Sequence, residues 1–494
     1  MGIVQRNSLK TSIVNYLGII IGGISTMFVY PLDWDLYGNI QFVLSSATLI
    51  SVFLSLGSHS ITNKFFPYFQ NNKIKGFLGL VAFYSLVNIL IITLILIVFR
   101  TSFFELLELG GFNEEQLTEN IFVIYSLGVL MVFSFLIRSQ SYNFGHIVYP
   151  DIISNLSVKI AVPTIVLLSY FSFINYQGVG LLLVLYHLLV VVWLTFSLRN
   201  VGGLDFQKGV LKRVPKSKHL EIIRYMFYGA MNHIGDILVY KIDIIMIGLM
   251  MTATDVGYYS IFLFLTVIID IPTNAVIRIT KAMISRGFED DKLEEINRIY
   301  KSASVNLFAL GIILFSLIWM NMNTFFYIMT NGDDLILYKT VFLFLALAKL
   351  FDMITSVNFY IISYSPFFRI NTLFIVLLAF INIFLNYYFI DAFGIVGAAI
   401  STATSMLLFN VAKTVFIMIK YKMHPFKWEY LIMGAFLIVA VLLPIFLPKV
   451  FEFTFLSILL SGIYTLLFIF TVYKLKISIE INNFIDKYRA RFFN

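Results

Sequence analysis

The sequence contains no cysteine and few charged residues. Cysteine is absent from all 494 positions, which excludes disulfide bonds, thiolate metal sites and cysteine nucleophiles. Charged residues make up 13% of the chain and hydrophobic residues 60%, whereas a soluble domain is roughly 25% charged and 45–50% apolar. Since no soluble core hides this much apolar surface, most of the chain is predicted to lie in lipid. A soluble enzyme, a nucleic-acid-binding protein and a secreted disulfide scaffold are excluded.

Motifs for nucleotide and metal chemistry are also missing. The chain has neither a Gly-x-x-x-x-Gly-Lys-Ser/Thr run nor a His-Glu-x-x-His run, which are the sequence signs of an ATP site and of a zinc peptidase. The sequence therefore predicts a protein that is not an enzyme and that has no cofactor and no bound metal. The energy for its activity would come from substrate concentration or from a gradient, and coupling to Na⁺ or H⁺ is left open.

Fourteen apolar segments are long enough to span a bilayer, which needs about 20 mostly apolar residues per helix. Each is too long and too uniformly apolar for a barrel strand, so we predict an all-α integral membrane protein. The segments are 12–30, 37–58, 77–99, 120–138, 150–173, 178–198, 225–250, 256–284, 303–320, 336–363, 367–389, 395–419, 429–447 and 454–473.

The charges of the loops alternate in sign along the chain. Lysine and arginine gather in 61–76, 199–224, 285–301 and the tail after 473, whereas acidic residues dominate 100–119. Cytoplasmic loops carry the excess of basic residues. Both termini are therefore predicted to be cytoplasmic, and the net charge of +8 is attributed to membrane orientation rather than to a nucleic-acid partner.

Two pairs of short segments indicate an internal repeat. Asp35–Ile40 resembles Asp255–Ser260, and the glycine-rich starts at Gly178 and Gly394 resemble each other, both at an offset of about 220 residues. Such repeats are typical of transporters that open alternately to each side. We therefore predict two six-helix lobes around a central cavity. The predicted divisions are an N-terminal lobe 1–198, a basic cytoplasmic linker 199–224, a C-terminal lobe 225–420, and a region 421–494 with two additional transmembrane helices and a basic cytoplasmic tail.

Several segments together resemble one known family. They are Lys241–Gly248 followed by Asp255–Ser260, Val376–Asn386 continuing to Phe393–Thr402, and the N-terminal Tyr37-Gly38, Ser55-Leu56-Gly57 and Phe65-Phe66-Pro67. In order and spacing they resemble the multidrug/oligosaccharidyl-lipid/polysaccharide (MOP) flippase superfamily, in its Wzx-like polysaccharide-unit flippase branch. The resemblance covers about residues 10 to 420.

This resemblance implies an activity, a location and partners. The implied activity is the movement of undecaprenyl-pyrophosphate-linked oligosaccharide units across the bacterial inner membrane by alternating access, for the biosynthesis of lipopolysaccharide O-antigen, capsule or exopolysaccharide. The implied partners are the lipid-linked oligosaccharide, membrane lipids, and the polysaccharide polymerase and chain-length machinery. Two departures separate the chain from its relatives. The first two segments lack the arginines of lipid II flippases, and 12–30 lacks the acidic residue common in multidrug extruders.

Two alternatives stay open. One is a cation-coupled multidrug extruder of the same superfamily, and the other is a membrane glycosyltransferase or polymerase. The acids of Asp33-Trp34-Asp35 would suit a metal in such a transferase. They lie in a short outer turn, however, and no outer loop has room for an acceptor site.

Ionisable groups at membrane depth are costly and usually face a cavity. The candidates for a substrate cavity are Lys159, Asn232, His233, Asp236, Tyr240, Lys241, Asp243, Asp270, Lys349 and Asp352. Lys159, Lys241 and Lys349 are the deep cations that could hold a pyrophosphate. Asn232, Tyr240 and Tyr258 could bind the sugars, and Asp236, Asp243 and Asp270 are the candidates for a coupling ion.

Structural roles are the alternative for several of these residues. Lys349 and Asp352 are three residues apart and share a helix face, so each can neutralise the other. Lys159 can extend to the interface, Asp243 can pair structurally, and His233 can be a buried neutral imidazole. Lys241 is the preferred substrate-binding cation, because it lies near mid-membrane and away from the acids of its own helix.

Overall fold

The computed structural model describes residues 3–109, 115–207, 209–452 and 454–493. All regular structure in these ranges is helical and none of it is strand, which confirms the predicted all-α class. Ten helices in the described part are long and apolar enough to cross a membrane. The chain forms two compact units, Met1–Tyr258 and Tyr259–Asn494, here called unit 1 and unit 2.

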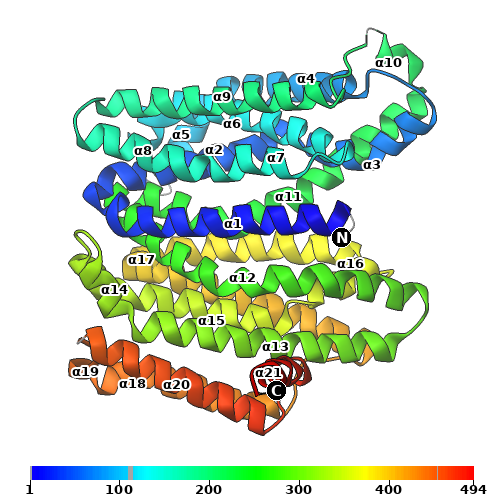
Figure 1. Ribbon diagram of the computed structural model, residues 1–494. Coiled ribbons are helices and arrows are strands. Elements are labelled where there is room, and N and C mark those ends of the chain that lie inside the picture. Colours follow the sequence, from blue (N-terminus) through cyan, green and yellow to red (C-terminus); the bar gives the residue numbers. More distant parts are fainter. Residues whose placement is uncertain (1–2, 110–114, 208, 453, 494) are drawn as a thin grey trace. The chain divides into compact units, whose positions relative to one another are not determined.

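Unit 1 is built around helices α2, α6 and α11 (Figure 1). α2 packs on α6 and α11, and α6 also packs on α9. The elements are α1 (Ile3–Phe28), η1 (Tyr30–Leu32), α2 (Trp34–Ser55), α3 (Ser58–Asn71), α4 (Phe77–Val98), α5 (Arg100–Leu109), α6 (Glu115–Asn143), α7 (Val148–Asp151), η2 (Ile152–Leu156), α8 (Val158–Tyr170), α9 (Tyr176–Asn200), α10 (Val210–Arg213) and α11 (Lys216–Met250).

The two glycine turns that indicated the repeat contact each other inside unit 1. Asp33 caps α2 by accepting a hydrogen bond from the Leu36 amide at 2.9 Å. One turn later, a Cβ on Gly38 would come within 1.7 Å of the Ala253 carbonyl oxygen and 2.9 Å of the Gly257 nitrogen. Only glycine allows this approach. The start of α2 and the segment after α11 are therefore packed backbone to backbone.

Unit 2 is organised by α13 and α17. α13 packs on α15, α18 and α20, and α15 also packs on α17. The elements are α12 (Ala253–Glu289), α13 (Leu293–Met320), α14 (Met322–Ile328), η3 (Asp333–Tyr338), α15 (Lys339–Thr355), α16 (Asn358–Tyr364), α17 (Arg369–Tyr421), α18 (Glu429–Phe446), α19 (Pro448–Glu452), α20 (Thr454–Lys474) and α21 (Ile479–Phe493).

α17 has 53 residues and contains two membrane-spanning runs. A single crossing needs about 20 residues, and the helix breaks at Gly394, whose φ of 60° and ψ of −141° are not helical. The break lies between the predicted segments 367–389 and 395–419. Side chains join the runs across it, because Asn382 Nδ2 donates to Thr402 Oγ1 at 3.1 Å and Ser401 Oγ donates to the Asn382 carbonyl at 3.2 Å. The polar residues of this motif therefore hold a helical hairpin together.

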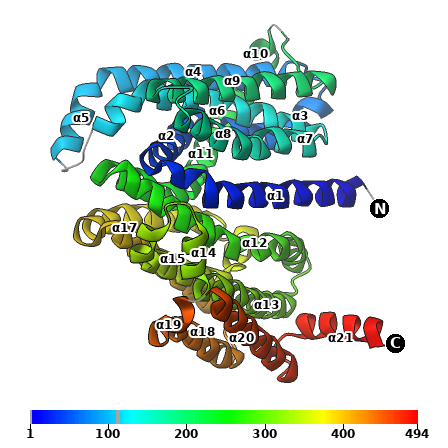
Figure 2. The same ribbon diagram turned by 60° about the vertical axis from the view of Figure 1, so that its left-hand side comes forward.

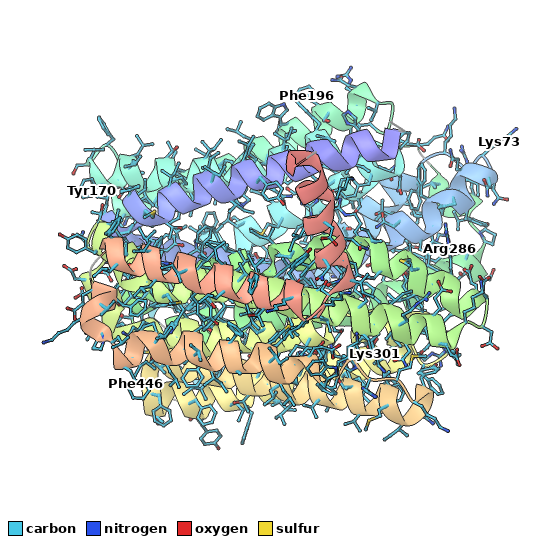
Figure 3. All side chains as sticks on the ribbon, turned by 60° about the horizontal axis from the view of Figure 1, so that its bottom comes forward. Lys73, Tyr170, Phe196, Arg286, Lys301 and Phe446 are labelled. Atoms are coloured by element: carbon cyan, nitrogen blue, oxygen red, sulfur yellow. The ribbon has the colours of Figure 1, made fainter. Side chains whose placement is uncertain are left out.

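The surface of the helices fits a lipid environment. On α4, the exposed fractions of Leu90, Leu94 and Ile97 are 63%, 61% and 66%, which water would disfavour. Figure 3 shows Lys73 and Tyr170 at opposite ends of unit 1, and Arg286 and Phe446 at opposite ends of unit 2. The chain is thus a multi-pass membrane protein. The number of fourteen spans and the division into lobes at 199–224 stay predictions.

Candidate functional site

A cavity of about 440 Å³ lies inside unit 1, among α2, α6, η2, α8, α9 and α11. Two cationic side chains, Arg138 and Lys241, contribute to its wall, and no carboxylate is among its described lining residues. Its other polar lining residues are Thr48, Ser134, Ser154, Asn155, Tyr186 and His187. Among its described lining residues, the cavity thus combines positive charge with hydrogen-bonding groups.

The part of the wall formed by α6, η2 and α9 is held by contacts within unit 1. Arg138 Nη1 donates to Asn155 Oδ1 at 3.4 Å, and the guanidinium lies 5.6 Å from the Phe135 ring centroid. His187 Nδ1 lies 2.9 Å from the Leu183 carbonyl oxygen. Because a carbonyl only accepts, Nδ1 carries the proton, and Nε2 of the neutral ring is an acceptor. These contacts orient one cation and one imidazole.

The sequence predicts Lys241 in a cavity, whereas Arg138 and His187 are not among the predicted residues. Arg138 stands at the end of the predicted segment 120–138, where it counts as a cytoplasmic charge, whereas α6 continues to Asn143. The polar residues Ser139, Gln140 and Ser141 suggest an end to the span, but Ser141 bonds back to the Ile137 carbonyl at 2.9 Å. His187 lies within an apolar run, and the polar nature of its side chain is the only sequence signal that it lines a cavity.

The remaining candidates on unit 1 have different positions. The side chains of Asn232, His233, Asp236 and Tyr240 lie outside the described residues. Asp243 is buried, with an exposed fraction of 3%. Lys159, at the start of α8, lies against α1, since a Cβ on Gly18 would be 3.2 Å from its Nζ. Lys159 is not among the residues that line the cavity.

Unit 2 brings the other candidates together in a charge cluster. Lys349 Nζ on α15 lies 3.0 Å from Asp270 Oδ2 on α12 and 3.2 Å from Asp352 Oδ2. Asn410 Nδ2 on α17 donates to Asp352 Oδ1 at 3.1 Å. Lys413, also on α17 and 4% exposed, interacts electrostatically with Asp352. We call Asp270, Lys349, Asp352, Asn410 and Lys413 the unit 2 cluster.

The unit 2 cluster has no formal net charge, because it contains two aspartates and two lysines. Lys349 is therefore neutralised where it lies, and the cluster joins three helices. Lys413 is not among the predicted residues, because it lies near the predicted cytoplasmic end of segment 395–419. Its spacing was a usable signal, since Asn410, Lys413 and Thr414 share one helix face at i, i+3 and i+4.

The unit 2 cluster continues into a buried hydrogen-bond network. Thr414 Oγ1 donates to the Asn410 carbonyl at 2.8 Å, and Asn358 Nδ2 donates to Thr414 Oγ1 at 2.8 Å. The Tyr300 hydroxyl of α13 donates to Asn358 Oδ1. The network links α13, α16 and α17, as expected for polar groups that must be satisfied away from water. No group of three or more His, Cys, Asp or Glu side chains suited to a metal occurs in the described ranges.

The arrangement of helices is that of known membrane transporters. No protein-family model matches the chain, and no curated protein does. Among solved structures, the chain is similar to the lipid II flippase MurJ in an inward closed conformation, with a TM-score of 0.70, 14% identity, and coverage of 95% of this chain and 99% of that chain.

Multidrug transporters share the same fold. An inward-facing multidrug resistance MATE family transporter of the MOP superfamily is similar with a TM-score of 0.59, 13% identity, and coverage of 82% of this chain and 94% of that chain. A MATE structure in complex with MaL6 gives a TM-score of 0.54, 14% identity, and coverage of 85% and 96%. The chain therefore has the fold common to a lipid flippase and to multidrug transporters. The neighbours are transporters and not enzymes.

Proposed function

We propose that the protein is a flippase for an anionic lipid-linked substrate, and that this substrate is an undecaprenyl-pyrophosphate-linked oligosaccharide. The observation that carries the proposal is the unit 1 cavity, where Arg138 and Lys241 line the wall and no described lining residue is acidic. A pyrophosphate that leaves water needs fixed cations, because an unpaired anion in a low-dielectric region costs several kcal/mol.

The polar lining of the cavity suits a sugar next to the pyrophosphate. Asn155, Tyr186 and His187 present side chains that donate or accept hydrogen bonds. Tyr186 OH lies 2.7 Å from Ser157 Oγ, so a hydrogen bond with Ser157 fixes the orientation of the Tyr186 hydroxyl. The likeness of the fold to a lipid II flippase supports a lipid-linked substrate without naming the sugar.

We infer the membrane location, the orientation and the pathway from the loop charges and from the family resemblance. The protein would lie in the bacterial inner membrane with both termini in the cytoplasm, and would serve surface polysaccharide biosynthesis by alternating access. Polymerase and chain-length proteins would receive the flipped unit. A gradient of Na⁺ or H⁺ would drive the cycle if a buried carboxylate such as Asp243, 3% exposed, takes the coupling ion.

The alternative of a drug extruder is tested in the same experiment. The purified protein is reconstituted into vesicles that contain either a fluorescent lipid-linked oligosaccharide or a cationic dye. We expect the oligosaccharide to become accessible to a membrane-impermeant reagent at a rate that depends on the protein, and the dye to be unaffected. Transport of the dye without movement of the oligosaccharide would favour the extruder and refute the flippase.

A further inference from the structure

The last helix of the chain turns away from the bundle of unit 2. After α20 the backbone passes through Lys476, whose φ is 52°, and Ser478 Oγ accepts a hydrogen bond from the Ile481 amide at 3.0 Å to start α21. In Figure 1, α18 and α20 run across the view while α21 is seen end-on. Figure 2 shows α21 lengthwise, extending away from α20. α21 therefore runs across the direction of the membrane helices.

The first turns of α21 are tied to the rest of unit 2. Asn482 Nδ2 donates to the Tyr473 carbonyl at 2.8 Å, and Tyr473 OH donates to Asp486 Oδ1 at 2.5 Å. The Ser302 hydroxyl of α13 donates to Glu480. Both acidic side chains of α21 thus have partners within unit 2. The direction of the helix is set by these contacts.

The sequence of α21 is amphipathic. Ile481, Phe484, Ile485, Tyr488 and Phe492 recur at steps of three or four residues, so their positions share one face of the helix. Ile485 is half-buried, whereas Asn483, on the opposite face, is exposed.

The basic residues of this region outnumber its acids. Lys474, Lys476 and Lys487 are exposed, and Arg489 and Arg491 follow along the helix. The five basic residues against the two acids of α21 give this region a net positive charge.

We propose that α21 lies flat in the headgroup layer of the cytoplasmic leaflet and binds anionic phospholipids there. An amphipathic helix with basic flanks and an apolar face binds at this depth, and the cytoplasmic leaflet is the anionic one. α21 follows the end of α20 at which the loop charges predict the cytoplasm. The proposal depends on that orientation and not on the substrate, so it is independent of the flippase function.

The absence of cysteine from the chain makes a direct test simple. Ile485→Cys on the apolar face and Asn483→Cys on the polar face each create one labelling site for an environment-sensitive fluorophore in the full-length protein. The labelled proteins are reconstituted into vesicles of phosphatidylcholine, with and without phosphatidylglycerol. We expect the label at position 485 to show a blue-shifted emission and to be quenched by lipids that carry a nitroxide near the headgroup. The label at position 483 should report water.

A charge-reversal variant tests whether α21 is attracted to the lipid by electrostatics. Changing Lys487, Arg489 and Arg491 to Glu should lower the quenching at position 485 in phosphatidylglycerol vesicles to the level found in phosphatidylcholine alone, as should high salt. The proposal would be overturned if the labels at both positions showed the same water-like emission. It would also be overturned if the label at position 485 were shielded from water but not quenched by nitroxide lipids. Quenching that is indifferent to phosphatidylglycerol, to salt and to the charge reversal would overturn the binding of anionic lipid.

Discussion

Replacement of Lys241 by Met tests the role of the unit 1 cavity, because it removes the charge and keeps most of the side-chain volume. Arg138 and Lys241 are the two cations among the described residues of the cavity wall. At an effective dielectric constant of about 20, a unit charge about 5 Å from another contributes about 3 kcal/mol. Rearranged water would offset part of this. We therefore expect a loss of about 2–3 kcal/mol, or about 30–150-fold, in the rate of flipping at low substrate.

The assay is the protein-dependent movement of a fluorescent lipid-linked oligosaccharide in vesicles, together with surface polysaccharide in cells that depend on the protein. Lys241→Arg should retain part of the activity, because a charge at this point matters more than the shape of the donor. Arg138→Met should lower the rate in the same way. Lys75→Ala, at an exposed loop lysine, is the matched control and should leave the rate unchanged.

One result would refute the role of the cationic cavity in substrate binding. If the Lys241→Met and Arg138→Met proteins are each present at normal levels and each flip the substrate at the rate of the unmodified chain, the cationic cavity does not bind the substrate. The substrate would then be held by hydroxyl and backbone groups, or would carry no charge. A loss of rate equal to the loss of folded protein would likewise point to stability instead of binding.

Three further predictions concern the fold and its orientation. Asp270→Asn should lower the free energy of unfolding of the purified protein by about 1–3 kcal/mol, because Lys349 loses one of its two half-buried aspartate partners. Combining it with Lys349→Met should lower stability by less than the sum of the two single changes, and additive losses would contradict the pairing. Gly38→Val should cost about 3 kcal/mol or more, since its Cβ would overlap a backbone carbonyl at 1.7 Å, whereas Gly462→Ala, with nothing within 4 Å, should leave melting unchanged. A reporter active only in the cytoplasm should be active when fused after Lys212, and silence there would reverse the orientation.

Much of the fold could be predicted from the sequence, because helix formation in lipid is local. Backbone groups in a bilayer must bond within their own segment, so length and hydropathy alone mark a span. The break in α17 falls between two predicted segments, because Asp391 and Gly394 interrupt the apolar pattern. The pair of Lys349 and Asp352 was also predictable, since a spacing of three brings two side chains to one helix face.

The membership of the sites was decided by tertiary structure. Asp270 contacts Lys349 only because α12 and α15 are neighbours in unit 2, and Lys413 joins them from α17. Arg138 belongs to the cavity because α6 continues past the predicted end of its span. The sequence by itself determined which segments are helices and which deep charges exist. Packing decided which charges are neutralised and which line a cavity, since residues far apart in the chain meet only when their helices do.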